Sequence, residues 1–158
     1  MKTIAIIHTS FVSVSDLAAL CKEIIPEVAV TNIVDDSLLP EVRKHNGLTP
    51  QVVRRICAYA VEAEQMGVDL ILNQCSSVGQ AVDVARGMLK TPYLKIDQPM
   101  AERAVDLGKR ISVIATVPTT LEPSCLLVEE AARSAGKVVR VKRCFVDGAY
   151  DALLQYGK

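Results

Sequence analysis

The sequence predicts an α/β protein built from two similar lobes, each with a parallel sheet flanked by helices. Short apolar runs rich in β-branched residues alternate along the chain with amphipathic segments of helical period. Strands joined by helices pair in parallel, because the helix returns the chain to the end of the sheet where the previous strand began. Two segments, "LILNQCSSVG" and "SVIATVPTTL", each have the pattern of a strand, a small polar turn and a helix, which indicates a weak internal duplication.

The predicted strands are short. Residues 2–8 and 69–73 have apolar interiors, which is typical of strands covered on both faces of a sheet. A polar segment at 35–47, with Pro40 and Gly47, is predicted to be a long loop. The full set of predicted strands comprises residues 2–8, 28–34, 69–73, 91–96, 110–116 and 137–145.

Helices are expected between these strands. Thr49 is a suitable N-cap with Pro50 at the first helical position, and Gly67 ends the same helix. Residues 117–124 are predicted to form a hydroxyl-rich turn before a later helix. The predicted helices span residues 16–25, 50–66, 77–89, 98–107 and 125–135, with another beginning near 147.

The strand at 91–96 completes the first series of alternating elements. We therefore assign residues 1–97 to a first lobe, which carries Cys75, and residues 98–158 to a second lobe, which carries a threonine-rich turn. The second lobe has two predicted strands before Lys158, so we expect it to be partial in this chain. A partial lobe exposes apolar surface, which favours either association, as in a homo-oligomer, or disorder.

Composition argues against several classes of protein. Lys plus Arg and Asp plus Glu are equal at 18 each, and aromatic residues make up 4 % with no Trp, so we expect no nucleic-acid partner. No apolar run approaches the ~18 residues of a membrane span, and the N-terminal run is too short for a signal peptide. The five cysteines include no C-x-x-C pair, which argues against a metal site or disulfides and favours a reduced, cytoplasmic setting. The sequence contains neither the G-x-G-x-x-G fingerprint of dinucleotide binding nor a P-loop, so neither a dinucleotide cofactor nor a P-loop nucleotide site is expected.

Hydroxyl-bearing residues follow three of the predicted strands. Ligands of open parallel sheets bind beyond the carboxyl ends of the strands, so these residues should gather there. Helix N-termini at the same edge favour an anion, and hydroxyls add donors without charge. The sequence therefore predicts a pocket for a small carboxylate or phosphate, lined by Thr9, Ser10, Ser76, Ser77, Thr116, Thr119 and Thr120.

Cys75 stands on the predicted turn between the strand at 69–73 and the helix at 77–89. A thiol close to a helix N-terminus loses its proton more readily than a free cysteine, and the thiolate can act as a base or a nucleophile. The alternative is a small buried cysteine that only packs.

Other titratable residues are weaker candidates. Cys21 and Cys57 lie in amphipathic helices and are expected to be core residues. Cys144 and His8 each end a strand and could approach the site, although a buried, hydrogen-bonded imidazole is an equal alternative for His8.

Three stretches resemble the aspartate/glutamate/hydantoin racemase superfamily: "NQCSSVG" around Cys75, "IATVPTTLEPS", and the opening "IAIIHTS". The resemblance covers nearly the whole chain. It implies two similar α/β lobes with the site between them, a reaction that needs neither pyridoxal phosphate nor a metal, and a catalytic role for Cys75. The substrate-binding residues that it implies are Thr9, Ser10, Ser76, Ser77, Thr116, Thr119 and Thr120, to which we add Asn73 from the cysteine motif.

The chain departs from this family at one position. Two-base racemases of the family place a second cysteine on a late strand of the second lobe, and Cys144 comes too early for it. The expected function is proton transfer at the α-carbon of a small carboxylate or amino acid, which for racemisation needs a base on each face. The alternatives are a one-cysteine decarboxylase or cis–trans isomerase of the same superfamily, or a non-catalytic protein that binds a small anion.

Overall fold

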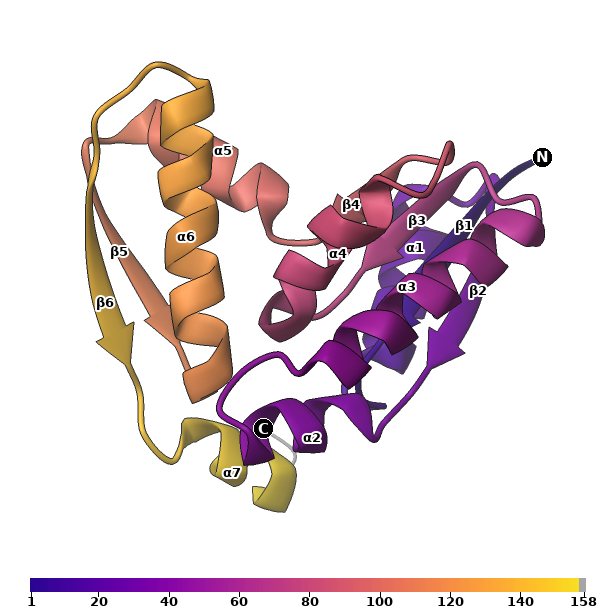
Figure 1. Cartoon of the computed structure of the whole chain (residues 1–158), viewed down its shortest axis with the longest axis horizontal. Helices are drawn as coiled ribbons and strands as arrows, with labels where there is room; N and C mark the ends of the chain where they lie inside the picture. Colours follow the sequence, from indigo (N-terminus) through magenta and orange to yellow (C-terminus); the bar gives the residue numbers. More distant parts are fainter. Residues whose placement is uncertain (157–158) are drawn as a thin grey trace. The chain divides into compact units, whose positions relative to one another are not determined.

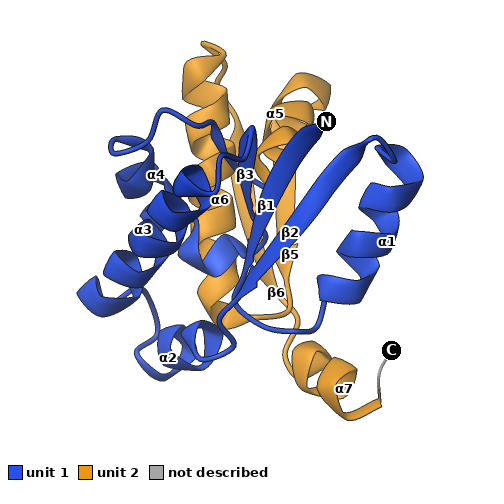
Figure 2. Cartoon of the chain, turned by 90° about the vertical axis from the view of Figure 1, so that its right-hand side faces the viewer, with its two compact units in different colours: residues 1–96 blue, residues 97–158 orange. Residues whose placement is uncertain are grey.

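The computed structural model describes residues 1–156 of the chain, which divides into two compact units (Figure 2). Unit 1 comprises residues 1–96 and unit 2 comprises residues 97–158. Every strand pairing in both units is parallel, and helices join the strands, so the predicted α/β class is confirmed.

Unit 1 contains a four-stranded sheet with the strand order β2-β1-β3-β4 (Figure 1). The central strand β1 pairs with β2 on one side and with β3 on the other, and Ile7 aligns with Asn73 of β3. The elements of unit 1 are β1 (Lys2–His8), α1 (Val14–Ile24), β2 (Val28–Val34), α2 (Leu38–Lys44), α3 (Pro50–Gln65), β3 (Leu70–Asn73), the 3₁₀ turn η1 (Ser76–Val78), α4 (Gly79–Arg86) and β4 (Tyr93–Lys95).

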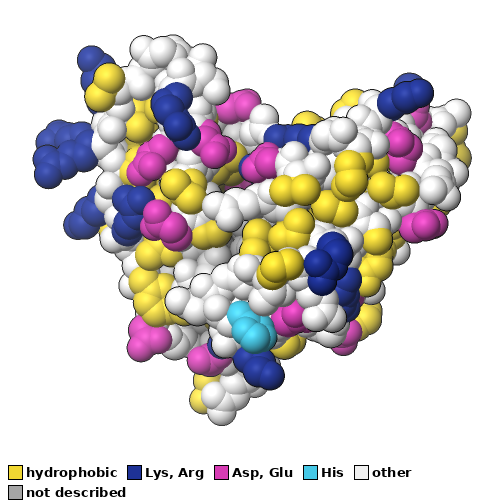
Figure 3. All heavy atoms as spheres, in the orientation of Figure 1, with side chains coloured by type: hydrophobic (Ala, Val, Ile, Leu, Met, Phe, Trp, Pro, Cys, Tyr) yellow, Lys and Arg dark blue, Asp and Glu magenta, His cyan; other side chains and the backbone are white. Residues whose placement is uncertain are grey.

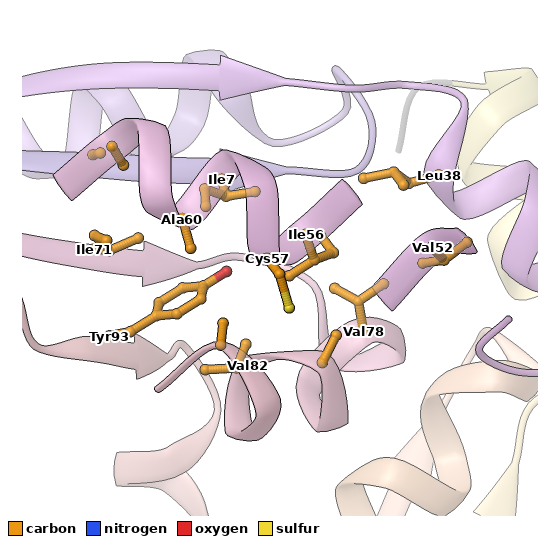
Figure 4. Close-up of a cluster of buried hydrophobic side chains, with 14 of the residues drawn as sticks. Ile7, Leu38, Val52, Ile56, Cys57, Ala60, Ile71, Val78, Val82 and Tyr93 are labelled. Carbon is orange, nitrogen blue, oxygen red and sulfur yellow. The ribbon is translucent and has the colours of Figure 1, made fainter. Parts of the chain in front are cut away.

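Helices flank both faces of this sheet. In Figure 2, α1 lies on one side of the strands, and α3 and α4 lie on the other. The core of unit 1 is on the α3 and α4 side, where Ile7 and Ile71 of the sheet pack with Ile56 and Val82 of the helices (Figure 4). All four of these side chains are fully buried.

The opposite face of the sheet is covered less completely. Helix α1 has no buried residue, and Leu20 and Ile24 on it remain exposed. The expectation that Cys21 is a core residue is therefore wrong: its helix packs loosely, and its side chain is only half-buried. Cys57 on α3 is buried in the core as expected.

Unit 2 contains a two-stranded sheet, in which β5 pairs in register with β6. Arg110 of β5 aligns with Arg140 of β6, and Ser112 aligns with Lys142. All four of these side chains are exposed, and basic side chains gather over this part of the molecule in Figure 3. The elements of unit 2 are α5 (Gln98–Leu107), β5 (Arg110–Ala115), α6 (Pro118–Ser134), β6 (Arg140–Phe145) and α7 (Ala149–Tyr156).

Two segments are more helical than the sequence predicts. The expected loop at 35–47 contains helix α2, because Leu38, Leu39 and Val42 form an apolar face that is buried, and Pro40 is tolerated within the first helical turn. The expected turn at 117–124 is the first part of helix α6, which starts at Pro118 and continues through Pro123.

No helix among residues 1–156 is long and apolar enough to cross a membrane. The same part of the chain contains no group of three or more His, Cys, Asp or Glu side chains that could hold a metal ion.

Candidate active site

The carboxyl ends of β1 and β3 lie side by side in unit 1. Ile7 aligns with Asn73, and the Gln74 N–H donates to the Ile7 carbonyl at 3.0 Å, so the ladder continues one residue past β3. The segments that follow these strands therefore start from the same edge of the sheet. They carry seven of the predicted site residues: His8, Thr9 and Ser10 after or at the end of β1, and Asn73, Cys75, Ser76 and Ser77 at the end of or after β3.

Cys75 joins the end of β3 to the turn that precedes α4. Its backbone is extended, with φ −113° and ψ 116°, and its side chain is half-buried against the core of unit 1. The residues that follow form a single 3₁₀ turn, η1, before α4 begins at Gly79. The thiol thus stands one short turn ahead of the α-helix.

Asn73 is a polar residue in an apolar place. It is fully buried, and its Nδ2 donates to the Cys75 carbonyl at 2.8 Å. The same carbonyl accepts from the Val78 N–H at 3.2 Å. Asn73 Oδ1 is buried and has no hydrogen-bond partner among the described residues.

His8 is also fully buried. Its Nε2 lies 2.9 Å from Asn32 Oδ1, and because that oxygen accepts, Nε2 carries the proton and Nδ1 carries the lone pair. Burial lowers the pKa of His8, against a smaller raising effect of the Asn32 hydrogen bond, so the imidazole is neutral at neutral pH. Thr9 beside it is buried, and Ser10 is half-buried.

An ion-pair network lies at the end of β2, next to the end of β1. The Asp35 N–H donates to the His8 carbonyl at 3.1 Å, and the Asp35 carboxylate accepts from Arg55, from Tyr59 Oη at 2.5 Å and from Ser37 Oγ at 2.7 Å. Burial raises the pKa of Asp35, but the hydrogen bonds from Tyr59 and Ser37 and the Arg55 charge outweigh it, so its pKa is lowered.

Sequence reasoning missed this network. Arg55 and Tyr59 are one turn apart on α3 and 20 and 24 residues from Asp35, and only the i, i+4 spacing of the two polar side chains gives a hint of a shared partner. Asp36, in contrast, is exposed, as a solvated loop residue would be.

Lys95 is a second feature without a clear sequence signal. Its side chain is 6 % exposed, and Nζ donates to Asp83 Oδ2 at 2.6 Å. It aligns with Asn73 across β3 and β4. Its stem passes under Gly79, where a Cβ would lie 3.7 Å from Lys95 Cδ. The start of α4, which follows the cysteine turn, thus rests on a buried ion-paired lysine.

The remaining predicted site residues are in unit 2. Thr116 follows β5 and is exposed, whereas Thr119 is buried and Thr120 is half-buried in the first turn of α6. Cys144 is half-buried in β6 and aligns with Ile114 of β5. The structure thus brings Thr116, Thr119 and Thr120 together at the start of one helix.

The chain is therefore a parallel α/β protein with a cysteine in the turn at the carboxyl ends of its strands. A model of the Asp/Glu/Hydantoin racemase family matches residues 6–144, and the chain belongs to this family. The family expected from the sequence motifs is therefore confirmed.

Individual relatives are similar over part of their length. A glutamate racemase from Picosynechococcus sp. is 33 % identical over 117 residues, which cover 73 % of this chain and 40 % of that protein. Among solved structures, glutamate racemase from Francisella tularensis in complex with D-glutamate has a TM-score of 0.72 at 14 % identity, covering 99 % of this chain and 57 % of the other. Aspartate racemase from Picrophilus torridus has a TM-score of 0.61 at 16 % identity, covering 98 % and 66 %.

These similarities support the fold and the family. At identities of 14 % and 16 %, the structural likeness concerns the fold alone. The chain spans between 40 % and 66 % of the length of these relatives.

Proposed function

We propose that this protein is an amino-acid racemase or a related isomerase that works without a cofactor, in which the Cys75 thiolate transfers a proton at the α-carbon of a small carboxylate or amino acid. The observation that carries the proposal is the position of Cys75. It follows β3 at the carboxyl edge of the unit 1 sheet, half-buried, in the turn that leads into α4. Ligands of open parallel sheets bind at this edge. Membership of the racemase family supports an enzyme rather than a structural protein.

The surrounding side chains suit this chemistry. Removal of an α-proton leaves negative charge that spreads onto the substrate carboxylate, and donors placed around that carboxylate stabilise the transition state. Uncharged hydroxyls supply such donors without adding a competing charge. We assign carboxylate binding to Thr9, Ser10, Ser76 and Ser77 of unit 1 and to Thr116, Thr119 and Thr120 of unit 2.

Racemisation needs a second acid–base group on the opposite face of the α-carbon. His8 and Cys144 are the candidates for that role in this chain. In unit 1 the other thiols are placed elsewhere: Cys21 lies on the loosely packed α1, and Cys57 lies in the core. The second candidate function is one-thiol chemistry, decarboxylation or cis–trans isomerisation, which needs only the thiol of Cys75.

The experiment is exchange of the substrate α-proton with deuterated water, followed by NMR. This readout needs only one base, so it does not depend on the identity of the second group. Glutamate and aspartate are the first substrates, and malonate-type and maleate-type compounds test the second candidate. Cys75→Ser should abolish exchange because a hydroxyl is a far weaker acid than a thiol, while its similar size preserves the fold. Cys21→Ser is the matched control and should exchange at the wild-type rate.

A measurement of ligand binding distinguishes a catalytic protein from one that only binds small anions. Cys75→Ser should still bind a carboxylate ligand, measured by calorimetry, because the hydroxyl donors are unchanged. If the protein processes a small carboxylate equally well with and without the Cys75 thiol, a non-catalytic lining role replaces the proposal. If the wild-type protein binds dicarboxylates and transforms none of them, the function is small-anion binding.

A further inference from the structure

Asn73 occupies a position that suits an apolar side chain. It is the last residue of β3 and is fully buried on the face of the sheet that carries Ile7, Ile71 and Tyr93. A buried amide that makes fewer hydrogen bonds than it could is unfavourable relative to an apolar group of the same size. Asn73 Oδ1 makes none among the described residues, and the ammonium of the neighbouring Lys95 is engaged by Asp83. The hydrogen bond from Nδ2 to the Cys75 carbonyl is therefore the contact that explains an amide at this position.

That bond ends on the backbone of Cys75. The Cys75 carbonyl accepts from Asn73 Nδ2 at 2.8 Å and from the Val78 N–H at 3.2 Å. On the other side of Cys75, the Gln74 N–H is bound to the Ile7 carbonyl at 3.0 Å. The Asn73–Gln74 peptide unit is thus anchored to β1, and the Cys75–Ser76 peptide unit is anchored to the side chain of Asn73. These two bonds restrict the backbone on either side of Cys75, and with it the direction of the Cys75 Cα–Cβ bond.

We propose that Asn73 is a positioning residue, whose amide holds the Cys75 carbonyl and thereby directs the thiol toward the α-carbon of the substrate. The inference rests on the proposed function of Cys75. It replaces direct substrate contact, the role that the sequence motif indicates for Asn73, because the amide is fully buried and one of its two N–H groups already binds the Cys75 carbonyl.

The proposal predicts how kcat and KM change when the Asn73 amide is lost. A thiol that is displaced by about 1 Å from its reactive position loses on the order of 100-fold in rate. Substrate binding depends on the hydroxyl donors and should change little. Loss of the Asn73 amide should therefore lower kcat by about 10- to 100-fold and leave KM within about threefold, because the ground-state contacts stay in place.

Asn73→Leu is the test variant. Leucine has a similar size and removes both the donor and the unpartnered Oδ1, so the protein should remain folded. Tyr93→Phe is the matched control: it removes a buried hydroxyl that, like Asn73 Oδ1, has no partner among the described residues, from the same face of the adjacent strand, and it leaves the cysteine turn untouched. Asn73→Asp keeps the shape and places an acceptor opposite the carbonyl, so it should be at least as impaired as Asn73→Leu.

Amide hydrogen exchange gives a readout that does not require activity. The Val78 N–H bonds to the carbonyl that Asn73 holds, so its protection should fall by about tenfold or more in Asn73→Leu if the turn loosens. The Ile71 N–H, which donates to the Pro92 carbonyl at 2.9 Å, reports on β3 itself and should keep its protection. In Tyr93→Phe both amides should behave as in the wild-type protein.

The outcomes are distinguishable. Reduced Val78 protection together with a lower kcat and an unchanged KM supports the positioning role. Unchanged Val78 protection in Asn73→Leu overturns it, whatever the activity. Reduced protection with an unchanged kcat, or a rise in KM alone, also overturns it. If wild-type and Cys75→Ser proteins exchange the α-proton equally well, the proposed function of Cys75 fails, and the positioning role fails with it. If the substrate α-proton exchange is lost in Cys75→Ser but retained in Asn73→Leu, only the positioning role of Asn73 is contradicted.

Discussion

The Asp35 network allows a quantitative test of what holds the edge of the unit 1 sheet. We expect Tyr59→Phe to destabilise the protein, because it deletes the hydroxyl that donates to the Asp35 carboxylate at 2.5 Å. The Asp35 side chain is 11 % exposed, so water replaces the lost donor poorly. A hydrogen bond to a charged group contributes about 1.5–3 kcal/mol. Since Arg55 and Ser37 still bind the carboxylate, we expect the free energy of unfolding to fall by about 1–2 kcal/mol.

The pH dependence of this loss has a defined sign. The pKa of Asp35 is lowered in the folded protein, so its interactions contribute stability above the unfolded-state pKa of about 3.9 and lose it as the pH falls through the folded pKa. Without the Tyr59 hydroxyl the folded pKa rises toward the unfolded one. The difference between wild type and variant should therefore be full at pH 7 and should shrink below about pH 4.

Urea unfolding at pH 7 and pH 3.5 measures both effects. Tyr93→Phe is the control, because the Tyr93 hydroxyl is buried without a partner among the described residues and its removal should be neutral or stabilising. The reasoning is refuted if Tyr59→Phe and Tyr93→Phe have the same midpoint, or if the Tyr59→Phe deficit is the same at both pH values.

Three further predictions concern unit 1. Because burial lowers the pKa of His8, the unfolded chain binds a proton first as the pH falls below about 6.5, so stability should drop by at most ~1.4 kcal/mol per pH unit, and His8→Gln should flatten this slope in urea unfolding between pH 6.5 and 5. Gly79→Ala should stabilise the protein by about 0.5–1 kcal/mol, since Gly79 is helical and an added Cβ makes ordinary contacts, whereas Gly67→Ala, at φ +77°, should lower the melting temperature. Thr49→Ala should cost about 1 kcal/mol in the same unfolding assay, because Thr49 Oγ1 accepts from the Val52 N–H at 3.2 Å and caps α3; an unchanged midpoint would show that the cap is dispensable.

Local sequence signals were sufficient where the structure depends on near neighbours. The strand-then-turn pattern around Cys75 places it at the end of β3, and Thr49-Pro50 marks the start of α3. The same signals failed where one residue type has two meanings. Pro40 and Pro118 indicate loops when a proline is taken as a breaker, yet both lie in first helical turns, where the missing N–H has no helical partner to lose.

The candidate site likewise contains residues that the sequence predicts and contacts that only the structure shows. Cys75 and the hydroxyl residues beside it follow from the order of elements, because parallel strands end at one edge. The contacts that hold the edge depend on tertiary structure: Arg55 and Tyr59 reach Asp35 from another helix, and nothing in a single sequence fixes that pairing. The bond from Asn73 to the Cys75 carbonyl spans two residues, but its significance depends on the burial of Asn73, which only the packed sheet determines.

The two-stranded sheet of unit 2 has a consequence for handling the protein in solution. Within residues 1–156, β5 and β6 pair only with each other, so each strand presents one unpaired edge to which another chain could add. The sheet carries the aligned Arg110 and Arg140 and the nearby Lys142, so a second copy that approached its edge would bring further positive charges toward these. This repulsion acts over about 8 Å at physiological ionic strength and only about 3 Å in 1 M salt. Concentrated salt should therefore promote self-association of this chain, and dilute buffer should keep its copies apart.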